Sequence, residues 1–425
     1  MSRLLLRAGR IISPADGLDA ELDLLVEDGR VRQIGSGITA RADEIIDAGG
    51  QIVAPGFIDL HAHLREPGGE ESETMETGLA AAVAGGFTAV CAMPNTRPVN
   101  DSAQATGRMV EEAKRIGLAR VFPIAAASMR SEGETLTDFP ALKAAGAVAF
   151  SDDGRPLKTP DLVRQALKHA RACGSLVIDH CEDVALSAGG AVNAGDAARE
   201  LGVKGIPNAS EDVCVARDIA LAAETDTRIH VAHISTAGAV ELVRSAKARG
   251  VRVTSEATPH HFTLSDEAVI QYGTAAKMNP PLRGAADRAA VLDGLADGSI
   301  DAIATDHAPH SPRLKAQPLE TAPFGVLGFE TALSLALREL VITGRISVAR
   351  LIEILSVQPA RILNLALGSL RAGSRGDITV FDPIQAWTYR ASEGKSKSRN
   401  SPFDGWSLTG KVTATIVGGR VVYRA

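Results

Sequence analysis

The chain has 425 residues, with 45 Lys and Arg against 51 Asp and Glu, so its formal net charge is −6 at pH 7. The charges are spread without long runs of one sign, which excludes the basic surface of a nucleic-acid-binding protein. Hydrophobic residues make up 45% of the chain and charged residues 23%, values that exclude wholesale disorder. The length predicts one large domain with a smaller attachment.

The N-terminal residues MSRLLLRAGR carry only three consecutive leucines between charges, which is too short for the apolar core of a signal peptide. The four cysteines are scattered and form no C-x-x-C pair, which argues against a disulfide scaffold and a structural zinc knuckle. We therefore expect no export and a cytoplasmic location.

Short alternating apolar segments, separated by Gly and Asp, run from residue 4 to about residue 52. This pattern is typical of small antiparallel strands. The same pattern returns near the C-terminus in RGDITVFDP and KVTATIVGGRVVYR, where Gly418–Gly419 predicts a hairpin. We expect residues 1–53 and 368–425 to form one small β-sandwich domain.

Between these ends, short runs rich in Val, Ile and Ala alternate with stretches of helical period, which indicates βα units around a parallel sheet. Eight such units predict a (β/α)₈ barrel over residues 54–367, with its active site at the carboxyl ends of the strands. The predicted strands are 56–63, 87–93, 120–126, 147–153, 175–180, 228–233, 251–256 and 301–306.

Residues able to bind a metal stand at the ends of five of these predicted strands. A single histidine at a strand end is more often structural, but the coincidence of six such residues favours a metal centre. The six are His61, His63, Asp153, His180, His233 and Asp306.

Imidazole and carboxylate ligands without thiolate suit zinc or another borderline divalent ion. Four His and two Asp are enough to hold two ions that share one carboxylate. Such a pair would lower the pKa of a water toward neutrality and polarise a carbonyl, which is the electrostatics of hydrolysis.

The sequence around these residues also resembles that of a known family. The segment GFIDLHAHLREPGGEESETMETGLAAAVAGGFTAVCAMPNTRPV resembles the signature region of the cyclic amidohydrolases, and in its details the type I dihydroorotases of bacteria. HAHLREPG, MPNT and TDHAPH are highly specific together. The similarity continues in order through FSDDG, DHCED, VAHIST, EATPHHF, KMNPPLR, ATDHAPH, FGVLGFE and SVQPARILNL, and so covers nearly the whole chain.

The resemblance implies two Zn²⁺ ions per subunit, held by the same six residues. One ion would be held by His61, His63, Asp153 and Asp306, and the other by Asp153, His180 and His233. Many amidohydrolases bridge their metals with a carboxylated lysine, but FSDDG has no lysine. Asp153 is therefore the expected bridge, with Asp152 as the alternative.

The reaction implied by the resemblance is the reversible hydrolysis of dihydroorotate to N-carbamoyl-L-aspartate in de novo pyrimidine biosynthesis. In this reaction Asp306 would be the catalytic residue. It would take the proton from the attacking water and pass it to the leaving nitrogen.

The resemblance also implies which residues bind the substrate. Arg65, Asn95 and His310 would hold its carboxylate, because a guanidinium can grip a carboxylate through two parallel hydrogen bonds. Without the resemblance, Arg65 would be interpreted as a surface charge and Asn95 as a turn residue. The full set of implied substrate-binding residues is His63, Arg65, Asn95, Asn279, His310, Phe324 and Gly325.

Two further residues near the ligands are expected to play structural roles. His230 differs in strand parity from His233, so on a regular strand it would point away from the metals. Cys181 differs in parity from His180 in the same way, which favours packing.

The segment 311–325 follows the eighth strand and contains four prolines and little helical period. We interpret it as a loop over the mouth of the site. It is either a lid that orders on substrate and excludes water or a static connection, and the sequence favours neither.

Two other functions are compatible with parts of the pattern. A hydantoinase, dihydropyrimidinase or allantoinase would share the H-x-H motif and the barrel, but its substrate lacks the ring carboxylate that Arg65 would bind. A dihydroorotase-like scaffold for aspartate carbamoyltransferase would have lost its ligands, and here all six are intact. We expect a homodimer, and an active enzyme could also bind that carbamoyltransferase.

Overall fold

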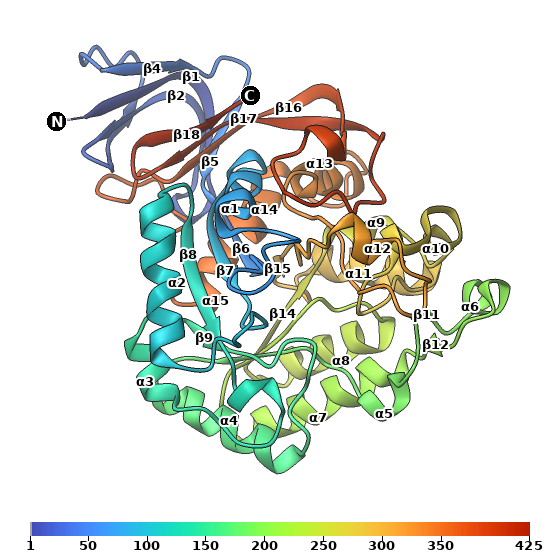
Figure 1. Cartoon of the computed structure of the whole chain (residues 1–425). Helices are drawn as coiled ribbons and strands as arrows, with labels where there is room; N and C mark the ends of the chain where they lie inside the picture. Colours follow the sequence, from blue (N-terminus) through green and yellow to red (C-terminus); the bar gives the residue numbers. More distant parts are fainter. Residues whose placement is uncertain (1) are drawn as a thin grey trace.

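Eight parallel strands form the barrel in the computed structural model, which describes residues 2–425 (Figure 1). They follow one another around the barrel in chain order, and a parallel bridge between Ala62 and His307 joins its first and last strands. The predicted (β/α)₈ barrel is confirmed, although most strands are shorter than predicted. Their bounds are β6 Phe57–Ala62, β7 Phe87–Ala92, β8 Arg120–Ala125, β9 Ala149–Phe150, β10 Val177–Asp179, β13 Ile229–Val231, β14 Val253–Ala257 and β15 Ala302–Ile303.

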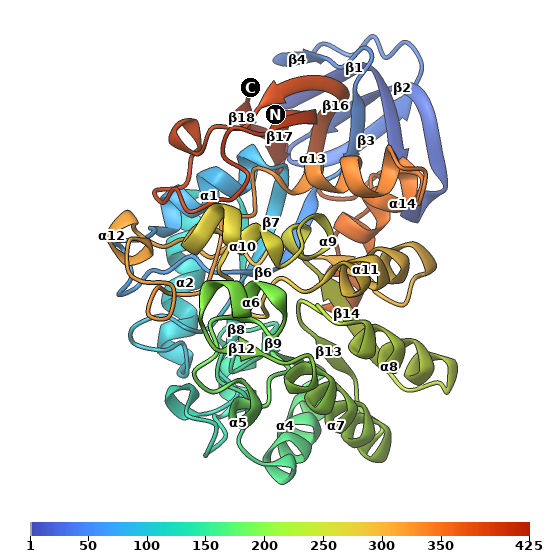
Figure 2. The same cartoon turned by 90° about the vertical axis from the view of Figure 1, so that its right-hand side faces the viewer.

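Helices cover the outside of the barrel and explain why its strands are apolar on both faces (Figure 2). Every residue of β6 and β7 is buried. The main covering helices are α1 Met75–Ala84, α2 Ala103–Ile116, α3 Phe139–Ala144, α4 Pro160–Ala172, α7 Ala209–Thr225, α8 Ala237–Ala248, α11 Ala285–Asp297, α13 Ala332–Ala336, α14 Val348–Ile352 and α15 Gln358–Ile362.

Local sequence sets the ends of these helices, as α2 illustrates. The side chain of Ser102 accepts a hydrogen bond from Ala105 N at its start, and Gly117 adopts a left-handed conformation at its end, with φ of 68°. Met109 and Ala113 are buried on the apolar face of the helix. None of the helices in residues 2–425 is both long and apolar enough to cross a membrane.

Shorter elements lie in the loops that follow the strands. α13 and α14 each continue into a π-helical segment, Leu337–Val341 and Glu353–Val357. The other short elements are α5 Val184–Ser187, β11 Val192–Asn193, α6 Asp196–Leu201, β12 Gly205–Ile206, α9 Pro259–Thr263, α10 Glu267–Tyr272 and α12 Pro312–Lys315.

The two ends of the chain form a separate β unit, as predicted. Its eight strands belong to one hydrogen-bonded sheet, in which β5 and β16 join the N-terminal strands to the C-terminal strands. In Figure 1 the blue and red ends lie together beside the barrel. The strands are β1 Arg3–Ser13, β2 Leu18–Glu27, β3 Arg30–Gly35, β4 Glu44–Asp47, β5 Ile52–Pro55, β16 Ile378–Thr388, β17 Ser407–Val417 and β18 Arg420–Arg424.

The sheet is attached to the barrel through polar and aromatic contacts. Thr379 Oγ1 donates to the carbonyl of Gly86 at 2.6 Å, and Thr415 Oγ1 donates to the carbonyl of Val83 at 2.6 Å. The Phe381 ring also packs with the barrel core. We propose a domain division at about residues 53 and 368, in keeping with the sequence pattern.

The connection between β16 and β17 leaves the sheet and packs on the barrel. Tyr389 and Phe403 are buried with Leu264 and Val326 of the barrel loops. Thus part of the C-terminal segment reaches the end of the barrel at which the predicted site residues lie, and this contact was not foreseen from the sequence.

Candidate active site

All six predicted metal ligands lie together at the carboxyl end of the barrel strands, and each is at most 7% exposed. Only His61 lies within a strand, because the barrel strands end early. The other five occupy the loops just beyond: His63 after β6, Asp153 after β9, His180 after β10, His233 after β13 and Asp306 after β15.

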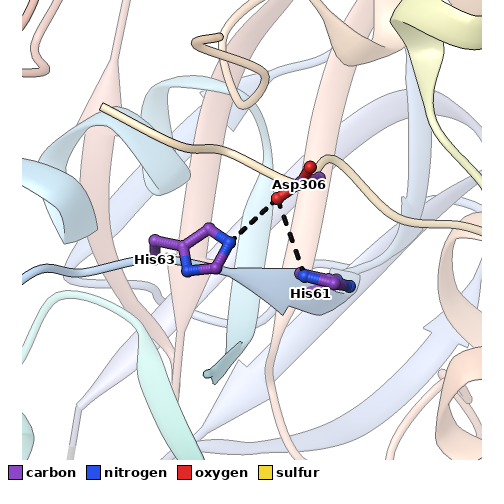
Figure 3. A group of neighbouring side chains, drawn as sticks. All are labelled: His61, His63 and Asp306. Atoms are coloured by element: carbon purple, nitrogen blue, oxygen red, sulfur yellow. Dashed lines mark hydrogen bonds and ion pairs between the residues drawn. The ribbon is translucent and has the colours of Figure 1, made fainter. Parts of the chain in front are cut away.

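One group of ligands consists of His61, His63 and Asp306, whose side chains point toward one another in Figure 3. Asp306 Oδ1 lies 2.9 Å from His63 Nε2 and 3.6 Å from His61 Nε2. The loop that carries Asp306 is fixed against the first strand, because His63 N donates to the carbonyl of His307 at 2.9 Å. We call these three residues the first half of the site.

The other two histidines, His180 and His233, form the second half of the site. His180 Nδ1 and His233 Nε2 lie 2.9 Å apart, so two imidazole nitrogens face each other. His233 reaches this position through an unusual backbone conformation with φ of 31°.

Asp153 stands between the two halves and faces all four histidines. Its Oδ1 lies 3.3 Å from His61 Nε2, 3.7 Å from His180 Nδ1 and 3.9 Å from His233 Nε2. Its Oδ2 lies 3.6 Å from His63 Nε2. Among the six residues, Asp153 is therefore the carboxylate placed to touch both halves.

The neighbouring Asp152 does not join this group. Its two oxygens accept hydrogen bonds from the backbone N and the hydroxyl of Ser128. Burial raises the pKa of Asp152 to about 6. The two adjacent carboxylates of FSDDG thus face different environments, and the geometry favours Asp153 over the alternative.

The carboxylates of the group are held in the charged form. Burial by itself would raise the pKa of Asp306 and of Asp153, but the surrounding histidines outweigh it, and both pKa values lie well below the usual range. For His61, burial is outweighed by Asp153 and Asp306, which raise its pKa. A bound cation would take the place of the proton on His61, because a metal ligand must offer a lone pair, and it would then balance the two buried carboxylates.

Glu256 explains which nitrogen His61 offers to this group. Glu256 Oε1 lies 3.1 Å from His61 Nδ1, and its Oε2 lies 3.1 Å from His230 Nε2. The bond to Glu256 places the ring proton on Nδ1, so that the buried His61 Nε2 faces Asp153 and Asp306 without a hydrogen-bond partner. An unpartnered buried nitrogen with its lone pair directed at two carboxylates fits a metal ligand.

Glu182 and Asn95 hold two of the other rings. Glu182 Oε2 lies 3.0 Å from His180 Nε2, which leaves Nδ1 of that ring for the site. Asn95 Oδ1 lies 2.8 Å from His63 Nδ1, and its Nδ2 donates to Asp153 Oδ2 at 2.9 Å.

His230 and Cys181 form no hydrogen bond or ion pair with the six candidate ligands, but the parity argument for His230 assumed a regular strand. The strand β13 ends at Val231, and the positive φ of His233 breaks the alternation. His230 Nε2 lies 3.1 Å from Glu256 Oε2 and so supports the carboxylate that holds His61. The sulfur of Cys181 faces Asp218, at 3.4 Å.

The predicted substrate-binding residues line one cavity of about 190 Å³ together with five of the six ligands. His61, the sixth candidate ligand, does not line it. The lining residues are His63, Arg65, Asn95, Asp153, Gly154, His180, His233, Asn279, Asp306, Ala308, His310, Phe324 and Gly325.

Arg65 brings a positive charge to this cavity that no described carboxylate pairs with. Its Nε donates to the carbonyl of Pro309 at 3.1 Å, and its Nη2 lies 3.2 Å from His310 Nε2. Burial lowers the pKa of Arg65 only to about 10, so it stays charged at neutral pH. Burial, reinforced by Arg65 and Lys315, lowers the pKa of His310 to about 2. A charged guanidinium between neutral partners is suited to bind an anionic ligand.

Phe324 and Gly325 are placed by contacts that only a glycine permits. Gly325 has φ of 136°, and a Cβ there would come within 2.7 Å of the Ala308 side chain. Its N donates to the carbonyl of Lys277 at 2.9 Å, while the carbonyl of Phe324 lies 2.7 Å from His310 Nε2. On the opposite wall, Asn279 Nδ2 donates to Glu182 at 3.0 Å.

The segment 311–325 covers part of this cavity and has more internal structure than its sequence predicts. It begins with the short helix α12, and Lys315 is buried and donates to the carbonyl of Pro323 at 2.9 Å. Lys277 Nζ donates to the carbonyls of Leu319 and Ala322, each at 2.6 Å. The two lysines tie the segment to the KMNPP loop.

Asn400, from the connection between β16 and β17, was not recognised in the sequence as part of the site. Its Nδ2 donates to the carbonyls of Ala308 and Gly325, each at 3.0 Å, and its Oδ1 accepts from His310 N at 3.0 Å. No motif pointed to it, because it lies 90 residues from His310 in the chain.

Comparison with known proteins shows which families and structures are similar to this chain. A family model described as "Dihydro-orotase-like" matches residues 50–239. A dihydroorotase of Geobacter sp. (strain M21) is 50% identical over 423 residues, which cover 99% of this chain and 99% of that protein. A dihydroorotase of Syntrophus aciditrophicus (strain SB) is 48% identical and covers 99% of each chain. The solved structure of the L-hydantoinase (dihydropyrimidinase) from Arthrobacter aurescens is similar with a TM-score of 0.88 at 27% identity, covering 100% of this chain and 96% of that one.

Proposed function

The chain belongs to the dihydroorotase family, and from that premise we propose how its residues carry out the reaction. The protein is a cyclic amide hydrolase that interconverts dihydroorotate and N-carbamoyl-L-aspartate, a step of pyrimidine biosynthesis. The main support for the residue roles is that six buried candidate ligands and the unpaired guanidinium of Arg65 lie together at a single small cavity.

The family is metal-dependent, and the buried His and Asp groups are candidate metal sites. We propose two Zn²⁺ ions per subunit, one in the first half of the site and one in the second half, with Asp153 between them. The support is the position of Asp153 against all four histidines and the unpartnered His61 Nε2. Bound divalent ions would polarise the ring carbonyl and lower the pKa of the attacking water.

Asp306 is the proposed proton carrier. Its Oδ1 faces His61 and His63, and the residue lines the cavity, so the carboxylate can accept a proton from water at the ring carbonyl. It then gives the proton to the ring nitrogen as the amide bond breaks. In ring closure the same carboxylate takes the proton from the carbamoyl nitrogen.

Arg65, Asn95 and His310 are proposed to bind the substrate carboxylate, while Asn279 and the backbone at Phe324 and Gly325 bind the amide edges of the ring. Arg65 supports this role because it stays charged beside the cavity and has no anionic partner. Asn95 bonds His63 and Asp153, so binding of the substrate carboxylate would exchange one of these bonds.

The residue roles are tested by metal analysis and turnover of the wild type and of D306N. Chelation should remove bound metal and dihydroorotate turnover together, and added Zn²⁺ should restore both. D306N should fold normally and lose roughly 10²–10⁴-fold in kcat, the usual cost of removing a general base. Near-normal kcat in D306N would remove Asp306 as the proton carrier.

A hydantoinase activity is the second candidate, because the similar solved structure is an L-hydantoinase. Arg65 argues against it, since hydantoin and allantoin lack the ring carboxylate of dihydroorotate. Steady-state assays of all three substrates decide between them. A preference for hydantoin or allantoin would overturn the assignment of Arg65.

We further propose a cytoplasmic homodimer that can associate with aspartate carbamoyltransferase. All four cysteines are free, which fits a reducing compartment. Analytical ultracentrifugation of the enzyme, alone and mixed with that carbamoyltransferase, measures both associations directly. A monomer that sediments unchanged in the mixture would contradict both.

A further inference from the structure

A groove lies far along the barrel from the metal ligands, at the amino end of β8. It is made of two adjoining cavities of about 600 and 610 Å³, and four residues line both of them: Leu365, Ala366, Leu367 and Arg375. The end of α2, the loop after α15 and the β17–β18 hairpin meet there. The groove shares no lining residue with the cavity that holds the ligands.

The lining of the groove is strongly cationic, although the chain as a whole is acidic. Among the described residues only one carboxylate lines it, Asp377, and both of its oxygens accept from Arg120, at 2.8 and 3.1 Å. That pair neutralises one cation, and Lys114 is paired with Glu111 outside the groove at 2.7 Å, which leaves the other arginines. The lining cations are Arg30, Lys114, Arg120, Arg371, Arg375 and Arg420.

Three of these arginines carry charge that no described carboxylate balances. Arg371 and Arg375 are exposed and make no ion pair, and the Arg30 side chain donates only to the carbonyl of Gly373, at 2.8 Å. Arg30 and Arg375 also face each other across an antiparallel bridge. Residues that oppose each other in this way place their side chains on the same face, where like charges destabilise the pair. An anion between them would remove this repulsion.

One wall of the groove is apolar. Phe122, Leu365 and Leu367 are only partly buried and line the cavity beside the arginines. Each cavity is within the range of roughly 300–1,000 Å³ found for sites that bind small molecules. The groove therefore offers forked guanidinium donors at one end, which match phosphate oxygens, and an apolar surface at the other.

We propose that this groove is a binding site for a small molecule that carries a diphosphate, or a similarly dense negative charge, on an apolar or planar body. The phosphates lie against Arg30, Arg371 and Arg375, and the body packs on Phe122 and Leu365. The site is independent of the ring-opening reaction, because it shares no residue with the reacting cavity.

Calorimetric titration of the metal-loaded enzyme with ADP and with inorganic pyrophosphate, at constant ionic strength, tests the proposal. The informative variant is R30A/R375A, and its control is R32A/R249A, which removes the same charge from exposed positions outside the groove. Because phosphate groups can also bind metal ions in the reacting cavity, the difference between the two double variants isolates the groove.

We expect the wild type and R32A/R249A to bind both probes alike, with ADP tighter than pyrophosphate. R30A/R375A should weaken binding of both by roughly tenfold or more, since a hydrogen bond to a charged group contributes enough for about that factor. Equal binding by the two double variants, or no binding by the wild type above a chloride control, would overturn the site. ADP no tighter than pyrophosphate would overturn the role of the apolar wall.

Discussion

The two halves of the active site hold their histidines in different ways. In the first half, the second nitrogen of each ring has a partner: Glu256 for His61 and Asn95 for His63. Glu256 is completely buried. In the second half, Glu182, which holds His180, is partly exposed, and His233 Nδ1 has no partner in the described structure.

The difference follows from the backbone that carries each half. Of the four histidines only His61 belongs to a strand, β6, in which Asp59 and Ala62 on either side of it pair with β7. His180 and His233 lie in loops beyond two strands of only three residues each. We therefore expect the first half to be preorganised and to retain its metal more firmly, and the second half to adjust as it binds.

Removing the residue that joins the halves should have the largest effect. D153N should lose metal from both halves, and its turnover should fall below that of D306N, which loses the proposed proton carrier, worth roughly 10²–10⁴-fold, and one candidate ligand of the first half only. The matched control is D152N, because an amide at that position can still bond the backbone and hydroxyl of Ser128. Elemental analysis and dihydroorotate assays measure both effects, and a D152N enzyme as impaired as D153N would exchange the roles of the two carboxylates.

The unequal anchoring of the halves can be tested with E256Q and E182Q. Loss of a carboxylate that orients a metal-binding histidine usually costs roughly 10–100-fold in metal affinity. We expect E256Q to reach this range and E182Q to show a smaller loss, because solvent already screens Glu182. Competition with a fluorescent chelator gives the affinities without relying on turnover. A larger loss in E182Q would reverse the comparison.

The smallest effect is expected for R65K, which keeps the positive charge beside the first half but loses the two parallel N–H donors of the guanidinium. Dihydroorotate kcat/KM should fall by roughly tenfold to a hundredfold, the equivalent of one charge-assisted hydrogen bond, mainly through KM. Metal content should not change, because in the described structure the Arg65 side chain bonds Pro309 and His310 and none of the six candidate ligands. A slow residual reaction with hydantoin, which has no carboxylate, should be unaffected by R65K. An equal loss of kcat/KM for both substrates would show that Arg65 does not bind the carboxylate.

The residues that the sequence did not reveal are those that hold another site residue in place. H-x-H, FSDDG and TDHAPH could be located because each contains a side chain able to bind metal at the end of an apolar run. Glu256 also ends such a run, in VRVTSE, but a single carboxylate at that place does not distinguish a residue that orients a histidine from an ordinary buried ion pair. Asn400 had no local signal, since it lies in a connection of the C-terminal segment.

The sequence by itself predicted the barrel and the six candidate ligands that gather at one end of it, because parallel strands bring their carboxyl ends to one edge whatever the length of the helices between them. It could not determine which nitrogen each ring offers, since that depends on a hydrogen bond from a distant segment: His61 and Glu256 are 195 residues apart. Nor could it place the cationic groove, where Arg30 and Arg375 are brought face to face by the pairing of the two chain ends. Only the tertiary structure decides such contacts, because they depend on distances between loops that no local pattern encodes.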